Sequence, residues 1–145
     1  MGSRAYSLGW VLTATSEAGA LGLSILVVES DPVARGVLLD HLRSHGFRIV
    51  EAEHGGPAIR KAVAQPFDYI LADLDWTGVS DGAALARWAR TNRPQTRVIL
   101  SSQTLSHWFP SDSAMAGLPI IKKPFAQGDL DRLLAPVAVT AIPGS

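Results

Sequence analysis

Four short apolar runs, each followed directly by polar residues, constrain the fold of this chain more than any other feature. The runs cover residues 25–28, 69–72, 98–100 and 119–121. Apolar runs of this length without polar alternation are typical of strands that are buried on both faces, as in parallel sheets. We therefore expect a parallel sheet that is covered by helices on both sides.

The polar residues that follow these runs predict a site. In an open parallel sheet the ligand crevice lies beyond the carboxyl ends of the strands. Acidic, hydroxyl and basic side chains should therefore converge there, with Asp73 in the middle. The residues that follow the four runs are Glu29, Ser30 and Asp31, then Asp73, then Ser101 and Ser102, and finally Lys122 and Lys123.

Segments with helical periodicity separate the predicted strands. Asp31 and Pro32 supply an N-cap and a first-turn proline for a helix that should run up to Gly46. Residues 47–52 should form a further strand, and helices are expected after residue 55, from residue 81 to 92, and around residues 130–134. The order predicts an α/β fold with a five-stranded parallel sheet, doubly wound by right-handed crossovers.

One helix should depart from this regular pattern. The segment between Ser102 and Leu118 should hold the fourth helix, but it contains Pro110. Proline inside a helix costs about 3 kcal/mol. We therefore expect this helix to be short or irregular, with a long loop before it.

Composition allows one domain and excludes several classes of protein. The chain has 145 residues, no cysteine, and 13 basic against 13 acidic residues. The balanced charge gives no indication of nucleic acid or an anionic membrane as a partner, and a disulfide framework or thiolate metal site is excluded. The four histidines show no evident ligand spacing, so each is interpreted as a solvated surface residue.

The predicted domain covers residues 23–138. Residues 1–22 are expected to be a flexible extension and residues 139–145 a C-terminal tail. The weakly apolar stretch at residues 8–12 is too diluted and too short for a signal peptide or a membrane span. We expect a cytoplasmic protein.

From residue 24 to about residue 137, the chain resembles the receiver domain of bacterial two-component response regulators, which is a CheY-like, flavodoxin-like fold. No single motif is specific for this family, but the combination of all of them, in this order and at these separations, is specific. The resemblance is carried by residues 27–32, Asp73, Asp81-Gly82, Ser102 and Lys123-Pro124-Phe125.

The resemblance implies roles for these residues. Asp73 would be the phosphoacceptor, with Lys123 and Ser102 contacting the phosphoryl group. A Mg²⁺ ion would be held by Glu29, Asp73 and Asp75, the last through its backbone carbonyl or its side chain. A domain of this kind is not an enzyme, and at most it loses its phosphoryl group slowly by itself.

Several positions depart from the family pattern. Ser30 stands where the family has a second acid, so it would be a weak metal ligand and the Mg²⁺ site should be weakened. Ile120 stands where the family often has an aromatic switch residue. Trp108 and Phe109, next to Pro110, are expected to contribute to a partner surface.

The resemblance also implies partners and leaves alternatives open. A single-domain response regulator would receive its phosphoryl group from a histidine kinase or a phosphotransfer domain. It would signal to a downstream protein that the sequence does not name, or through a homodimer. A pseudo-receiver that signals without phosphate is one alternative. The segment Asp73-Leu74-Asp75-Trp76-Thr77-Gly78 also resembles the opening motif of haloacid-dehalogenase-type phosphatases.

Overall fold

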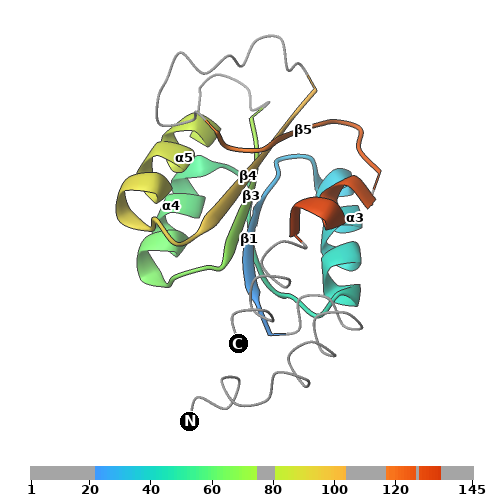
Figure 1. Ribbon diagram of the computed structural model, residues 1–145, viewed down its shortest axis with the longest axis horizontal. Coiled ribbons are helices and arrows are strands. Elements are labelled where there is room, and N and C mark those ends of the chain that lie inside the picture. Colours follow the sequence, from blue (N-terminus) through green and yellow to red (C-terminus); the bar gives the residue numbers. More distant parts are fainter. Residues whose placement is uncertain (1–21, 75–80, 104–116, 127, 135–145) are drawn as a thin grey trace.

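The computed structural model describes residues 22–74, 81–103, 117–126 and 128–134. Within these residues the chain alternates between strands and helices (Figure 1). The elements are β1 (Ser24–Val28), α3 (Pro32–Ser44), β2 (Arg48–Ala52), α4 (Gly55–Ala64), β3 (Tyr69–Asp73), α5 (Asp81–Asn92), β4 (Arg97–Ser102) and β5 (Ile120–Lys122). A further helical segment, which we call the C-terminal segment, covers residues 128–134.

The five strands form one parallel sheet in the order β2-β1-β3-β4-β5. Helices α4 and α5 cover one face, and α3 and the C-terminal segment cover the other (Figure 1). The predicted α/β fold with a doubly wound five-stranded sheet is confirmed. The helix expected between Ser102 and Leu118 lies outside the described residues.

Each strand of the sheet centre contributes to two hydrophobic cores. In β1, Leu26 and Val28 pack on the side of α4 and α5, whereas Ile25 and Val27 pack on the side of α3. Successive side chains of a strand point to opposite faces, so a strand buried on both sides must be apolar throughout. This is the physical reason for the uninterrupted apolar runs.

Helix α3 begins as predicted, and only some of its apolar positions are buried. The Asp31 carboxylate accepts hydrogen bonds from the backbone N–H groups of Val33 and Ala34, which satisfies two free donors of the first turn. Leu39 and Leu42 are the buried positions of the helix. Val33 and Val37, although they lie at helical spacing, are 74% and 56% exposed.

None of the helices among the described residues is both long and apolar enough to cross a membrane.

Candidate functional site

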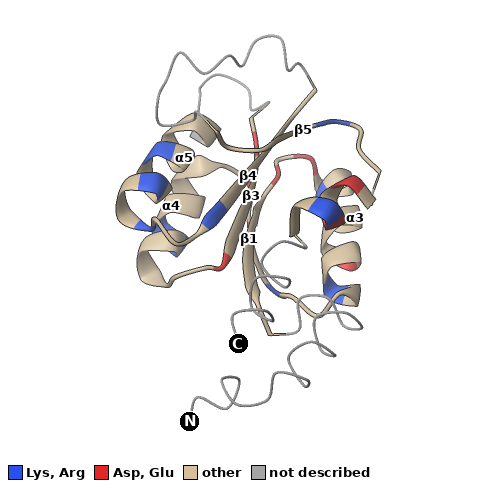
Figure 2. Cartoon of the chain, in the orientation of Figure 1, with Lys and Arg blue, Asp and Glu red and all other residues tan. Residues whose placement is uncertain are grey.

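The carboxyl ends of four strands meet at one edge of the sheet. The parallel register pairs Val28 with Ala72 and Asp73 with Ser101, and Ser102 pairs with Lys122. Acidic segments follow β1 and end β3, and a basic segment ends β5 (Figure 2). The polar residues that follow the apolar runs are therefore neighbours in space, as the position of the crevice in parallel sheets predicts.

Three charged side chains form the centre of this edge. The Lys123 Nζ atom lies 2.9 Å from Glu29 Oε1 and 3.2 Å from Asp73 Oδ2. The exposed fractions of these side chains are 14% for Lys123, 3% for Glu29 and 4% for Asp73. Two carboxylates that are removed from water are thus held together by one ammonium group, which supplies the charge compensation that their burial requires.

The protonation of Lys123 is stabilised by its neighbours. Burial by itself lowers the pKa of this lysine, but the hydrogen bond from its ammonium to Glu29 and the charges of Asp73 and Glu29 outweigh burial. The net effect is a pKa raised above the ordinary value of 10.5. Lys123 is therefore a fixed positive charge at neutral pH.

The turn after β1 holds Glu29 in place. Glu29 Oε2 accepts a hydrogen bond from the Asp31 N–H at 3.2 Å, and the Glu29 carbonyl accepts one from Arg35 Nη1 at 2.6 Å. Arg35 Nε in turn pairs with Glu51 Oε1 at 3.2 Å. The Asp31 side chain is engaged as the N-cap of α3, as expected, so Glu29 is the acid of this turn that faces Lys123.

A cavity of about 500 Å³ opens beside the charged residues. Its polar end is lined by Glu29, Ser30, Asp73 and Lys123. Most of its other lining residues come from α3, the segment after Lys123 and the C-terminal segment, and include Val37, Leu38, His41, Phe125 and Leu130. Asp73 can therefore be reached from the cavity, whose wall beyond the charged residues is largely apolar.

The donor set at the polar end fits a hard divalent cation. Mg²⁺ is bound through oxygen ligands, usually one or two carboxylates with water. Glu29 and Asp73 both contact the same ammonium group, so both carboxylates can reach one positive charge at this place. Ser30 is exposed at the cavity and offers only a hydroxyl. Asp75 lies outside the described residues.

Helix α5 approaches the end of β3 very closely at Gly82. A Cβ atom built on Gly82 would lie 2.8 Å from Leu74 Cδ2 and 3.0 Å from the Asp73 carbonyl oxygen. The first separation is shorter than real Cβ contacts and the second is tighter than most of them, so a side chain here would force the Leu74 side chain to move and would press on the Asp73 carbonyl. This contact explains why the second residue of α5 is a glycine.

Replacing Gly82 by alanine should therefore destabilise the fold, by about 1–3 kcal/mol for an overpacked site. It should also slow any reaction of Asp73, because the new methyl group presses on the carbonyl of that residue. Gly56→Ala is the matched control: Gly56 is likewise the second residue of a helix, α4, and its nearest neighbours for a Cβ lie at 3.8 Å. Urea unfolding of both variants measures the difference, and equal stabilities would contradict the steric explanation.

The structure places the other predicted residues as follows. Ser102 is fully buried at the end of β4, and the next residue, Gln103, lines the cavity. Ile120 begins β5 and packs against the core on the α4 and α5 side. Trp108 and Phe109 lie outside the described residues, so their contribution to a partner surface stays a prediction.

The interpretation of the histidines was wrong for His41. Its side chain is only 9% exposed and lies 2.7 Å from Asp131, at the wall of the cavity. His41 lies in the last turn of α3 and His45, four residues on, is the C-cap of that helix, a spacing that places two side chains on one side of the helix end and that could have been recognised. Their partner Asp131 is 90 residues away along the chain, so no local pattern indicates it.

The fold and the edge site together define a class of α/β proteins with a carboxylate, a lysine and an acidic turn at the ends of parallel strands. The family model of the response regulator receiver domain matches residues 25–135. The chain therefore belongs to the response regulator receiver family of two-component systems. The resemblance stated from the sequence is confirmed. No curated protein matches the chain.

Solved structures of receiver domains resemble this chain over most of its length. One is the receiver domain of the sensor histidine kinase PA1611 from Pseudomonas aeruginosa PAO1, with a magnesium ion in its active site cleft. It has 29% sequence identity and a TM-score of 0.69, over 81% of this chain and 98% of that one. Another is the response regulator TrrA from Thermotoga maritima with Mg²⁺-BeF, at 26% identity and a TM-score of 0.69, over 79% and 98% of the two chains. TrrA in complex with the histidine kinase ThkA is similar in fold, at 24% identity and a TM-score of 0.67, over 79% and 97%.

Proposed function

We propose that this receiver domain accepts a phosphoryl group on Asp73 and signals by binding other proteins. The observation that carries the proposal is the contact of Lys123 with both Asp73 and Glu29 at the wall of an open cavity. The donor would be a phosphohistidine of a histidine kinase or a phosphotransfer domain. Exposed Val33 and Val37 on α3, the second of which lines the cavity, offer apolar contacts to the donor protein.

The chemistry follows from the charges. An oxygen of the Asp73 carboxylate attacks phosphorus, the P–O bond forms as the P–N bond to the donor imidazole breaks, and the imidazole leaves with the bonding electron pair. Negative charge on the phosphoryl oxygens needs a positive partner, and Lys123 already lies beside the attacking carboxylate. Ser102 is proposed to donate a hydrogen bond to the phosphoryl group, which would couple the group to the following loop.

A Mg²⁺ ion would supply charge neutralisation and orientation of the phosphoryl group. Glu29 and Asp73 would hold it through carboxylates, Asp75 through its carbonyl or side chain, and Ser30 only through a hydroxyl. We infer that the affinity for Mg²⁺ is lower than that of a receiver with a second acid at position 30.

Ser30→Asp should therefore tighten Mg²⁺ binding by roughly tenfold. A carboxylate about 4 Å from a divalent ion contributes about 2 kcal/mol in a water-like dielectric, and screening by salt lowers this toward about 1 kcal/mol. Gln65→Glu, which adds one negative charge at an exposed residue after α4, should leave Mg²⁺ affinity unchanged. Isothermal titration calorimetry measures both. Equal affinities of the wild type and Ser30→Asp would mean that Asp75 or Asp31 already compensates.

Two alternative functions predict different experimental results. A pseudo-receiver would bind its partners without phosphate, and the exposed Ser30 in place of an acid favours it. A haloacid-dehalogenase-type phosphatase would turn over p-nitrophenyl phosphate repeatedly and would depend on Asp75.

Phosphotransfer profiling tests the proposal directly. The full chain is incubated with candidate autophosphorylated histidine kinases, and acid-labile phosphate on the chain is measured over time. Transfer from one kinase much faster than from the rest supports the proposal. Absence of transfer from every kinase, together with no labelling by small phosphodonors, supports the pseudo-receiver.

A further inference from the structure

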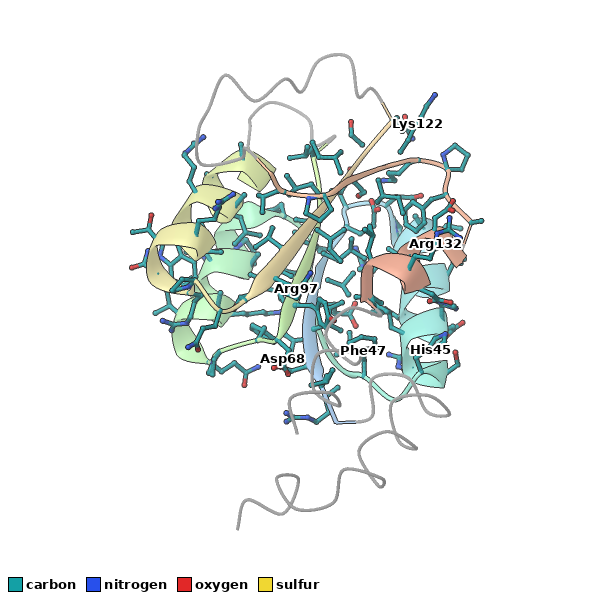
Figure 3. All side chains as sticks on the ribbon, viewed as in Figure 1. His45, Phe47, Asp68, Arg97, Lys122 and Arg132 are labelled. Carbon is teal, nitrogen blue, oxygen red and sulfur yellow. The ribbon has the colours of Figure 1, made fainter. Side chains whose placement is uncertain are left out.

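A second cluster of possible ligands lies on the α3 side of the sheet, away from the charged edge. It consists of His41 and His45 from the end of α3 and Asp131 from the C-terminal segment. The ligand atoms of these three residues all lie within 4.8 Å of one another. Figure 3 shows His45 at the end of α3, and Arg132, the neighbour of Asp131, on the C-terminal segment at the same side of the sheet.

Both imidazoles are directed at the same oxygen. His41 Nε2 lies 2.7 Å from Asp131 Oδ1, and His45 Nε2 lies 3.6 Å from that same atom. The two rings are in edge-to-face contact, with centroids 4.6 Å apart. A hydrogen bond from His41 to Asp131 accounts for one ring, but it leaves open why the second ring presents its Nε2 to the same carboxylate.

We propose that His41, His45 and Asp131 form a binding site for a transition-metal ion such as Zn²⁺. Two histidines four residues apart on a helix can present two nitrogen ligands to one ion. With bonds of 2.0–2.2 Å, a tetrahedral zinc site has ligand atoms separated by about 3.3–3.5 Å. The His45–Asp131 separation already lies near this range, and the His41–Asp131 contact has to lengthen by roughly 0.6 Å.

The cluster is partly exposed to solvent, as expected for a site whose metal ion can enter and leave. His41 is 9% exposed, whereas His45 and Asp131 are 36% and 39% exposed. One side of the cluster is therefore open, so that water can complete the coordination and the ion has a path of entry. The ligand set also selects the metal, because imidazole favours zinc, copper and nickel, whereas Mg²⁺ requires oxygen ligands.

The bound ion would join two elements that are far apart in the sequence. The α3 helix and the C-terminal segment cover the same face of the sheet, and His41 also lines the cavity that leads to Asp73. Metal binding would hold the two helical elements together along that cavity. The inference goes beyond the proposed phosphoacceptor function and does not depend on it.

The test uses the full chain without Mg²⁺, first freed of metal with a chelator. Co²⁺ is added as a spectroscopic substitute for Zn²⁺, and its visible absorption reports nitrogen coordination. Thermal unfolding with and without Zn²⁺ gives a second readout. At a hundredfold excess of free Zn²⁺ over Kd, the midpoint should rise by roughly 5–10 °C, because the ion binds the folded chain.

Substitutions distinguish this cluster from other places where the metal ion could bind. His45→Gln, at the more exposed histidine, should weaken metal binding at least tenfold, and Asp131→Asn should do the same. His54→Gln is the matched control: His54 is exposed, and its side chain makes no capping hydrogen bond at the start of α4. Asp73→Asn should retain full Zn²⁺ binding, which distinguishes the cluster from the acidic edge.

Unfolding of each variant in the chelator shows whether it is folded before metal is added. Should Asp131→Asn not fold, His45→Gln decides the question by itself. The proposal is overturned if the wild type shows neither a cobalt absorption band nor a thermal shift with Zn²⁺. It is equally overturned if His45→Gln binds zinc as tightly as the wild type does.

Discussion

Asp73→Asn should reduce acid-labile phosphate on the chain to background, whether the donor is a cognate kinase or a small phosphodonor. An amide oxygen is a far weaker nucleophile than a carboxylate, and asparagine fills the same space, so the loss should not come from unfolding. The carboxylate is also the one that Lys123 contacts at the end of the central strand β3. We expect a loss of at least a hundredfold in the rate of incorporation.

A matched variant and a mapping experiment make this result specific. Asp40→Asn removes a carboxylate that is 84% exposed on α3, and it should leave incorporation unchanged. Mass spectrometry of the borohydride-reduced protein locates the modified residue. Retained incorporation in Asp73→Asn, located at Asp75 or Asp81, would refute the assignment of the phosphoacceptor.

Lys123→Met should lower the free energy of unfolding by about 3–5 kcal/mol at neutral pH, since removing one partner of a buried ion pair leaves an uncompensated charge. Here two carboxylates, those of Glu29 and Asp73, lose their common partner. Mg²⁺ should restore more stability to this variant than to the wild type, because the cation can replace the ammonium between the carboxylates. Lys122→Met, at an exposed neighbouring lysine, should be nearly neutral.

The pH dependence gives an independent measurement. The pKa of Lys123 is raised in the folded chain, so the lysine contributes stability that is fully present below its ordinary value of 10.5. That contribution is lost as the pH rises through the higher folded pKa. Urea unfolding between neutral and strongly alkaline pH should therefore show an alkaline loss of stability in the wild type that Lys123→Met lacks. Parallel curves for the two proteins would show that Lys123 is not coupled to the acids.

Much of the fold could be predicted because a strand that is buried on both faces has to be apolar at every position, and this pattern is visible in the sequence. The apolar runs marked β1, β3, β4 and β5, and the Asp31-Pro32 pair marked the start of α3. Helical periodicity was less informative about which residues are buried. Val33 and Val37 follow it, yet the sheet covers only the side of α3 that carries Leu39 and Leu42.

The site could be predicted in part for a related reason. Parallel strands bring their carboxyl ends to one edge, so the positions of Glu29, Asp73 and Lys123 in the sequence were sufficient to place them together. No comparable rule predicts which residues of two helices come into contact. The approach of Asp131 to His41 depends on how two distant helical elements lie on the sheet, and neither residue indicates it locally.

The C-terminal segment has a consequence for the order in which this domain can fold during its synthesis. Leu130 and Leu134 close the core on the α3 side, the Tyr69 hydroxyl donates a hydrogen bond to the Leu134 carbonyl at 2.6 Å, and Asp131 contacts His41. A nascent chain that has emerged from the ribosome only as far as β5 therefore leaves exposed the part of this apolar face that α3 does not cover. That face can be completed only after residues 128–134 have emerged, and until then it is a surface to which a chaperone can bind.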